Sequence, residues 1–348
     1  MKIGLFDHIE HGDRPLATLF DERLEFIQAA DEAGFYCLHL AEHHATPLNM
    51  VPVPGVFLGA VARLTKKIRL GPLGYLLPLY SPLRMIEEIC MLDHLSHGRL
   101  EVGVGRGVSP FELRYHKVEH DQSREIFIDA FKCISAGLTA DSLTYSGPHY
   151  SYDNVPIALR PLQQPHPPFW YGSSGAEGSS WAGEHGLHFV TLGPNDFAKA
   201  NIDTFKEAFA KRGGRAAQPK PEFPGGIAIG VQRHIFVDET DEKARRWAKP
   251  AMEVHLKHIN WLRTQHGQTG AAARLKNVRG ANFEECVEEG TVIAGSPATV
   301  RAEIEKQMAQ LGANYLLTYM FLGTMSLDEA MRSLSLFKSE VMPAIELL

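Results

Sequence analysis

The chain has 348 residues, a length that allows two ordinary domains or one large α/β barrel. Hydrophobic residues make up 44% of it and charged residues 22%, which excludes collagen, coiled coils and intrinsic disorder. The net charge is −6 and no block of like charges occurs, which argues against a nucleic-acid-binding protein or a polybasic membrane patch. We therefore expect small-molecule ligands.

The cysteine pattern and the first residues indicate the compartment. The four cysteines lie far apart and form no C-x-x-C pair, which fits reduced thiols better than a disulfide framework. The opening MKIGLFD reaches an acidic residue before the apolar core of a signal peptide could form. No apolar run approaches the ~18 residues of a membrane span. The sequence therefore predicts a cytoplasmic protein that is not inserted in a membrane.

Short apolar runs rich in β-forming residues alternate with helical patterns along the first part of the chain. Strands are expected at residues 2–7, 35–40, 68–77 and 100–105. Helices are expected at residues 54–64 and at three apolar stripes: Phe20, Leu24 and Ile27; Met85, Ile89 and Leu92; and Phe127, Phe131, Ile134 and Leu138. The alternation is thus four units deep before residue 143.

Prolines and glycines interrupt this alternation at residues 143–168, where we expect a hairpin and an irregular insertion. Strands follow at residues 169–172, 188–192, 227–237 and 315–319, with helices at 177–186 and 195–212. Ser296-Pro297 predicts a helix start, and Ser326 with Glu329 predicts a capping box. The polar residues 261–290 are expected to form a mobile loop over the site.

The eight predicted strands favour a single (β/α)8 TIM barrel with insertions, forming one domain over residues 1–348. The main alternative is an open doubly wound sheet, which usually carries G-x-G-x-x-G after its first strand. Here Gly4 stands alone, and the run from Gly103 to Gly107 has Val108 where the third glycine belongs. The barrel is therefore the favoured fold class.

In such a barrel the chemistry lies where strands end, and three strand ends are notable. Glu42-His43-His44 ends the second strand, Gly105-Arg106-Gly107 the fourth, and Gly172-Ser173-Ser174-Gly175 the fifth. The last of these leads into a helix, whose free N–H groups and dipole attract anions, and Arg106 adds a planar cation. Together they predict a phosphate cradle. Taken singly, the Gly-Ser-Ser-Gly turn is more often an ordinary loop, Arg106 fits a rim ion pair equally well, and the His pair also fits a structural role.

A metal site is the less favoured interpretation of the histidines. Glu42 and its neighbours His43 and His44 have no H-E-x-x-H helix or second ligand cluster to complete a site. His255 and His258 could chelate from one helix, but a solvated helix face is favoured. Four apolar residues near strand ends are candidates for pocket lining or for the core: Phe6, Leu48, Met50 and Tyr75.

Several motifs follow one another along nearly the whole chain. They occupy residues 34–44, 77–107, 123–124, 181–186, 295–297 and 336–343. In this order they resemble those of the bacterial luciferase-like flavin-dependent monooxygenases. Residues 77–107 and the closing segment Leu336-Phe337-Lys338-Ser339-Glu340-Val341-Met342-Pro343 are the most specific parts of the resemblance.

The resemblance implies a barrel that binds reduced FMN at the carboxyl ends of its strands and usually forms a homodimer. It assigns the flavin phosphate to Arg106, Arg124, Ser173, Ser174, Gly175 and Gly178. It places Leu73 and Gly74, joined by a cis peptide bond, against the flavin ring, and His43 beside the reactive face. Gly105, also in the cofactor site, replaces the reactive cysteine of the light-emitting α chain, and Ser174 replaces an acidic residue. A general family member is therefore favoured over a light emitter.

The activity implied by the resemblance is two-component monooxygenation. A separate NAD(P)H:flavin reductase supplies reduced FMN as a co-substrate, and one atom of dioxygen enters a small, apolar organic substrate. His43 would hydrogen-bond the reacting oxygen or take a proton. Three alternatives stay open: a deazaflavin-dependent dehydrogenase on the same barrel, a non-catalytic flavin-binding barrel, and a metal-dependent barrel hydrolase.

Overall fold

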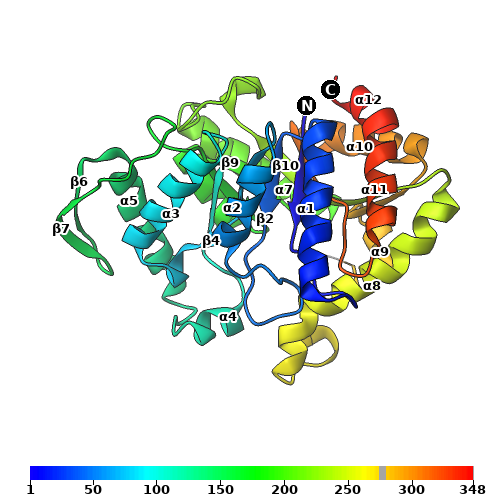
Figure 1. Cartoon of the computed structure of the whole chain (residues 1–348), viewed down its shortest axis with the longest axis horizontal. Coiled ribbons are helices and arrows are strands. Elements are labelled where there is room, and N and C mark those ends of the chain that lie inside the picture. Colours follow the sequence, from blue (N-terminus) through cyan, green and yellow to red (C-terminus); the bar gives the residue numbers. More distant parts are fainter. Residues whose placement is uncertain (274–279, 348) are drawn as a thin grey trace.

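The computed structural model describes residues 1–273 and 280–347, and its main sheet is a parallel barrel surrounded by helices (Figure 1). The barrel strands are β1 (Lys2–Asp7), β2 (Cys37–Leu40), β3 (Arg69–Pro72), β4 (Tyr75–Leu76), β5 (Val102–Gly105), β8 (Phe169–Ser173), β9 (His188–Thr191), β10 (Ile229–Val237) and β12 (Tyr315–Tyr319). The predicted fold class is therefore confirmed.

The strand order explains how the barrel closes. Hydrogen-bonded neighbours follow the order β3-β2-β1-β12-β10-β9-β8-β5-β4. β3 and β4 are two parts of one barrel strand, separated by Leu73 and Gly74, whose peptide bond is cis as expected. β4 pairs with β5, and a parallel bridge joins Leu70 of β3 to Leu100, two residues before β5, so both parts of this strand adjoin the β5 segment. Counting β3 and β4 together, the described residues form an eight-stranded closed barrel.

Helices cover the outside of the barrel, each with one buried face. They are α1 (Leu16–Ala33), α2 (Pro54–Leu64), α3 (Pro82–Leu95), α5 (Ser123–Thr139), α6 (Ala176–His185), α7 (Asn195–Lys211), α8 (Asp241–Gln265), α10 (Pro297–Leu311), α11 (Leu327–Leu336) and α12 (Met342–Ile345). The predicted cap of α10 at Ser296 and the capping box of Ser326 and Glu329 are both confirmed. No helix in the described ranges is long and apolar enough to cross a membrane.

The predicted insertion lies outside the barrel. It contains the antiparallel hairpin β6 (Ser142–Ser146) and β7 (Ser151–Pro156), which projects at the left of Figure 1. Residues 157–168, which follow the hairpin, form neither helix nor strand. Three short elements were not predicted: α4 (Pro110–Tyr115), α9 (Phe283–Glu288) and β11 (Val292–Gly295), which pairs with β10 outside the barrel order.

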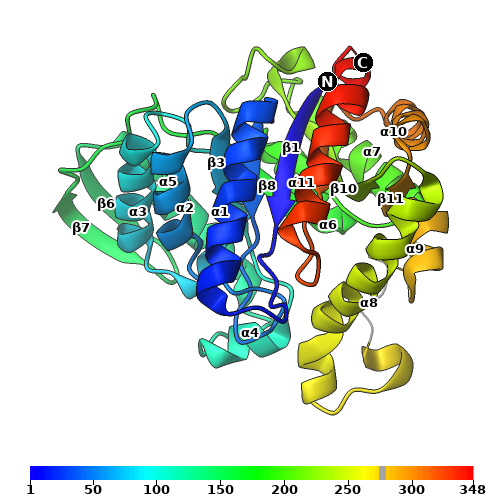
Figure 2. The same ribbon diagram turned by 45° about the vertical axis from the view of Figure 1, so that its right-hand side comes forward.

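The segment predicted as a mobile loop, residues 261–290, is partly regular. Residues 261–265 end the long helix α8, Gly270–Ala273 form a short 3-10 turn, and α9 follows. Residues 274–279 lie outside the described residues, and the mobility of the segment stays a prediction. Figures 1 and 2 show that the end of α8 and helix α4 lie at the same end of the molecule, toward which β1 runs. Both elements therefore border the carboxyl end of the barrel.

Asp31, near the end of α1, fastens this helix to the start of β3. Its carboxylate accepts hydrogen bonds from the backbone N–H groups of Lys66, Lys67 and Ile68, at 2.7, 2.8 and 2.6 Å. Burial disfavours the charged carboxylate, but these three bonds outweigh it and lower the pKa of Asp31. From the other side, the Arg99 guanidinium donates to the carbonyl oxygen of Ile68 at 2.7 Å.

We expect Asp31→Asn to lower the free energy of unfolding in urea at pH 7 by about 2–4 kcal/mol, because a neutral amide cannot accept all three bonds. Asp21→Asn, at an exposed position of the same helix, is the control. A carboxyl group with a lowered native pKa contributes stability above its unfolded pKa and loses it at lower pH. The difference between Asp31→Asn and the parent must therefore shrink below about pH 4, and a constant difference would contradict this account.

Candidate active site

A cavity of about 490 Å³ is lined by residues at or just after the carboxyl ends of the barrel strands. Its volume is in the range of small-molecule sites. All of the predicted site residues line it, although they come from five separate segments of the chain: His43, Leu73, Gly74, Gly105, Arg106, Arg124, Ser173, Ser174, Gly175 and Gly178. The structure thus brings the predicted residues together, and their individual roles stay predictions.

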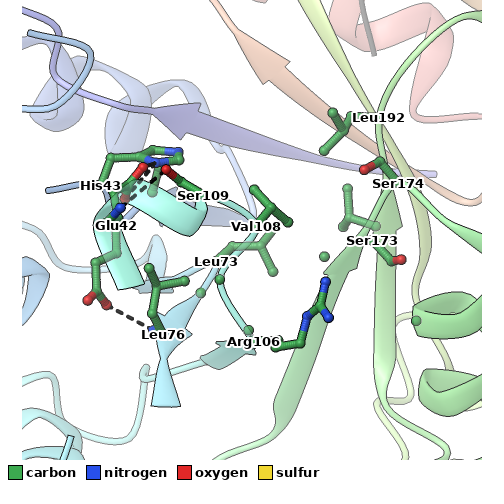
Figure 3. Close-up of a pocket in the computed structure, with 18 of the residues that line it drawn as sticks. Glu42, His43, Leu73, Leu76, Arg106, Val108, Ser109, Ser173, Ser174 and Leu192 are labelled. Atoms are coloured by element: carbon green, nitrogen blue, oxygen red, sulfur yellow. Dashed lines mark hydrogen bonds and ion pairs between the residues drawn. The ribbon is translucent and has the colours of Figure 1, made fainter. Parts of the chain in front are cut away.

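One side of the cavity contains groups that attract anions. Ser173 and Ser174 lie where β8 gives way to α6, on the same side as Arg106 (Figure 3). Gly175 is the N-cap of α6, and no side chain among the described residues caps this end. The first N–H groups of α6 are therefore available to a ligand, and the helix dipole favours a negative one.

Two arginines add positive charge to this side. Arg124, in the first turn of α5, has its Nε 3.0 Å from Oε1 of Glu177. Arg106, directly after β5, makes no hydrogen bond or ion pair to any residue that the structure describes. Burial raises the pKa of Tyr171, while the charges of Arg106 and Arg124 oppose this rise. Both guanidinium groups are thus close to the end of β8, where a phosphate would meet them.

The opposite side of the cavity contains His43. Its Nδ1 lies 3.2 Å from Oε1 of Glu112, and the other Glu112 oxygen accepts the backbone N–H of His44 at 3.1 Å. Because an ionised carboxylate only accepts hydrogen bonds, Nδ1 of His43 carries the proton of this contact. In the neutral ring, Nε2 is then the nitrogen left to accept a hydrogen bond from a ligand.

Glu112 also sets the charge of His43. Burial disfavours the imidazolium, but the charge and hydrogen bond of Glu112, together with the Glu42 carboxylate, outweigh it and raise the pKa of His43. Burial likewise opposes ionisation of Glu112, yet His43 and the His44 N–H lower the pKa of Glu112. Each group therefore stabilises the charged form of the other: the imidazolium of His43 and the carboxylate of Glu112.

His44 lies outside the cavity lining and has a different partner. Its Nε2 is 2.8 Å from Oε1 of Glu42, and its ring meets that of His116 edge-on at 4.5 Å. The second Glu42 oxygen accepts the backbone N–H of Leu76 at 3.1 Å (Figure 3). Burial raises the pKa of Glu42, and these hydrogen bonds oppose the rise. Neighbouring histidines thus point to different sides, as the alternation of extended chain predicts.

Glu112 is a site residue that the sequence analysis missed. It lies on α4, a helix of six residues whose N-cap Ser109 accepts the Glu112 N–H at 3.4 Å. Ser109-Pro110 is the same signal that predicts α10 at Ser296-Pro297. The helix was therefore detectable, but nothing in the sequence indicated that its glutamate would face a histidine 69 positions away.

The expectation for His255 was wrong, and the structure decides between the two open interpretations of the apolar residues near strand ends. His255 does not lie on a solvated helix face: it is fully buried, and its Nδ1 contacts the Glu10 carboxylate, because α8 turns this side toward the barrel. Of the apolar candidates, Phe6 and Leu48 line the cavity, while Met50 and Tyr75 do not. Tyr75 belongs to the core, where its hydroxyl donates to Glu88 at 2.6 Å.

The chain is similar to known proteins over nearly its whole length. Residues 1–315 match the luciferase-like monooxygenase family. The chain is 34% identical to the uncharacterized protein y4wF of Sinorhizobium fredii, over 99% of this chain and 97% of that one. It is 27% identical to the oxygenase component of the flavin-dependent trigonelline monooxygenase of Acinetobacter baylyi, over 70% of this chain and 67% of that one.

Two solved structures show the same fold. The oxygenating constituent of 3,6-diketocamphane monooxygenase from Pseudomonas putida, a type II Baeyer-Villiger enzyme in complex with FMN, has a TM-score of 0.81 at 20% identity, covering 99% of this chain and 98% of that one. A secondary alcohol dehydrogenase dependent on coenzyme F420 has a TM-score of 0.74 at 18% identity, covering 99% and 98%. The barrel is thus shared by enzymes that use different flavin-type cofactors.

The contact with Glu112 predicts a measurable change at His43. In Glu112→Gln the pKa of His43 should fall, because the amide removes the negative charge that outweighs burial. The shift can be followed by NMR titration of the imidazole of His43, with Glu119→Gln, an exposed change in the segment after α4, as control. An unchanged or higher pKa in Glu112→Gln would show that Glu112 does not set the charge of His43.

Proposed function

The chain belongs to the luciferase-like monooxygenase family of oxidoreductases, and from this membership we propose that it is the oxygenase of a two-component FMN system. A separate NAD(P)H:flavin reductase supplies reduced FMN, and one atom of dioxygen enters a small organic substrate with an apolar body. The observation that carries the proposal is one cavity with a phosphate-type cradle on one side and the His43–Glu112 pair on the other.

The described residues fit FMN. Arg106, Arg124, Ser173 and Ser174, with the N–H groups of α6 from Gly175 to Gly178, would hold its phosphate. Leu73 lies between this cradle and His43, and it would contact the ring together with Gly74 and Gly105, which also line the cavity. When bound, reduced FMN supplies two electrons and reacts with dioxygen, so that one oxygen atom enters the substrate and the other leaves as water.

His43 would act at the reacting oxygen. Glu112 keeps the proton on Nδ1, so Nε2 of His43 is free to accept a proton or, once charged, to donate one. The raised pKa of His43 favours the charged form of the imidazole, which can donate a proton. Glu112 is buried and the His43 side chain is 25% exposed, so this part of the cavity is only partly open to water, which limits side reactions of a reactive oxygen.

The remaining walls suit an apolar substrate body. They include aliphatic and aromatic side chains from β1, from the loops after β2, β5 and β9, and from the last turns of α8: Phe6, Leu48, Val108, Leu192, Ile259 and Leu262. Removing such surface from water favours binding of an apolar ligand. These side chains do not distinguish one apolar skeleton from another.

A separate reductase is proposed because the chain lacks a dinucleotide fingerprint and because the trigonelline relative is named an oxygenase component. With FMN and NADH alone, the protein should consume NADH no faster than a protein-free control. With an added flavin reductase and ¹⁸O-labelled dioxygen, one labelled atom should enter the product from a panel of aldehydes, ketones and thioethers. Rapid NADH consumption without reductase would contradict the two-component assignment.

A homodimer is proposed from the surface of α2 and α3, which pack side by side. Val56 on α2 is 77% exposed and Met91 on α3 is 55% exposed. Leu64 and Leu95, at the ends of the same two helices, are also exposed. A second copy of the chain would remove this apolar surface from water, and sedimentation velocity of the parent and of Val56→Glu would test the assignment.

The F420-dependent fold neighbour keeps a deazaflavin dehydrogenase as the second candidate. Titrating the protein with FMN and with the deazaflavin separates the two, because the proposal requires tighter binding of reduced FMN. A non-catalytic flavin-binding barrel would bind FMN without substrate-dependent oxygen uptake. For a metal-dependent hydrolase, the described residues offer no group of three His, Cys, Asp or Glu side chains placed to hold a metal ion.

Arg106→Ala should weaken binding of reduced FMN by about 1.5–3 kcal/mol, the range of a charge-assisted hydrogen bond to phosphate. The measurement is anaerobic fluorescence titration. Arg84→Ala is the control, since Arg84 is 80% exposed on α3 and lies outside the cavity lining. Equal affinity in parent and Arg106→Ala would remove Arg106 from the cofactor site.

His43→Ala should reduce the yield of product per dioxygen consumed more than His44→Ala does, because His43 lines the cavity and His44 does not. Coupled assays that measure product and oxygen together supply the ratio. We expect His44→Ala to act mainly on stability, through the loss of its bond to Glu42. A greater loss of coupling in His44→Ala would reverse the assignment of the two histidines.

A further inference from the structure

A third arginine lines the cavity and is not used by the cofactor cradle. Arg263 lies in the last turn of α8, and its guanidinium makes no hydrogen bond or ion pair with the residues of ranges 1–273 and 280–347. The same helix contributes the apolar side chains Ile259 and Leu262 to the wall. Arg263 is partly buried, so its charge loses some of its water without gaining a protein partner, and an anionic ligand in the cavity would supply that partner.

The position of Arg263 differs from that of the cradle. Burial lowers the pKa of Arg263 and the charge of Glu112 opposes this, so Arg263 is close to the His43–Glu112 side. Arg106 and Arg124 act instead on Tyr171, at the end of β8. The cavity therefore has two separate cationic ends, and one flavin phosphate occupies only one of them.

Glu112 does not form an ion pair with Arg263. One of its oxygens meets Nδ1 of His43 at 3.2 Å, and the other accepts the N–H of His44 at 3.1 Å. Both oxygens are thus engaged on the histidine side, and no ion pair between Glu112 and Arg263 is formed. The guanidinium keeps its paired N–H donors for a ligand, and their planar geometry matches the two oxygens of a carboxylate.

We propose that the substrate carries a carboxylate group and that Arg263 binds it, with the apolar body lying along Ile259 and Leu262 and the reacting end near His43. This inference rests on the proposed function and narrows its substrate class. The carboxylate would orient the substrate between α8 and the flavin side of the cavity, since a bidentate contact fixes both distance and direction. Arg263 is thus a specificity-determining residue.

The experiment compares two probes of nearly equal shape, benzoate and benzamide, on the full-length protein saturated with FMN. Binding is measured by saturation-transfer NMR, without turnover. The parent should bind benzoate more tightly than benzamide. Arg263→Gln should weaken benzoate binding about 10-fold or more, as expected for a charge-assisted hydrogen bond, and should change benzamide binding less than about 2-fold. The affinity of Arg263→Lys for benzoate should be intermediate, because lysine keeps the positive charge but lacks the paired N–H donors of the guanidinium.

Arg114→Gln is the matched control, since Arg114 is an exposed arginine of the nearby helix α4 that does not line the cavity. No preference for benzoate in the parent, or the same preference in Arg263→Gln, would overturn the proposal. So would a loss of FMN affinity in Arg263→Gln with unchanged benzoate binding, because Arg263 would then serve the cofactor. The ¹⁸O experiment reports on oxygenation independently, so failure of the monooxygenase assignment is seen separately.

Discussion

The close approach of β3 and β4 to β5 is the constraint on which the barrel and its site depend. A Cβ atom on Gly71 would lie 1.6 Å from the carbonyl oxygen of Glu101, and one on Gly103 would lie 2.2 Å from that of Pro72. Any side chain at either position would push the strands apart and break the bridge that closes the barrel. Leu73 lies between β3 and β4 and Arg106 directly follows β5, so closure of the barrel and the spacing of the candidate flavin site are set together.

A buried carboxylate, that of Glu101, lies at the amino end of the barrel, opposite the cavity. Glu101 lies close to the Arg69 guanidinium, its Oε1 is 3.1 Å from Nζ of Lys220, and its Oε2 accepts the indole N–H of Trp170 at 2.6 Å. Burial disfavours this carboxylate, yet the two cations outweigh it and lower the pKa of Glu101. Removing one partner of such a group leaves a buried charge unpaired, which is strongly destabilising. The amino end of the barrel thus supports stability, while the cavity at the carboxyl end is left for chemistry.

The sequence predicted most of the fold because barrel strands are short apolar runs and the helices have clear stripes and caps, as at Ser326. It did not predict β11, a strand of four residues that closely follows the polar segment 261–290, which was expected to be a loop, and directly precedes the helix start at Ser296. At the site, strand ends and glycine-flanked Arg106 were visible, because they are local patterns. Glu112 and Arg263 were not, since their importance comes only from the positions of His43 and the cavity, which are far away in the sequence.

The contribution of α8 to the cavity has a consequence for how such a protein diversifies. The cradle is built from strand ends, whose backbone is shared with the closed barrel, whereas Leu262 and Arg263 come from the end of an outer helix. Replacement of these two side chains alters the ligand wall without removing a hydrogen bond of the sheet. Mutations that would redirect the enzyme to a new compound are therefore separated from those that would unfold it, and evolution can explore the first kind at little risk.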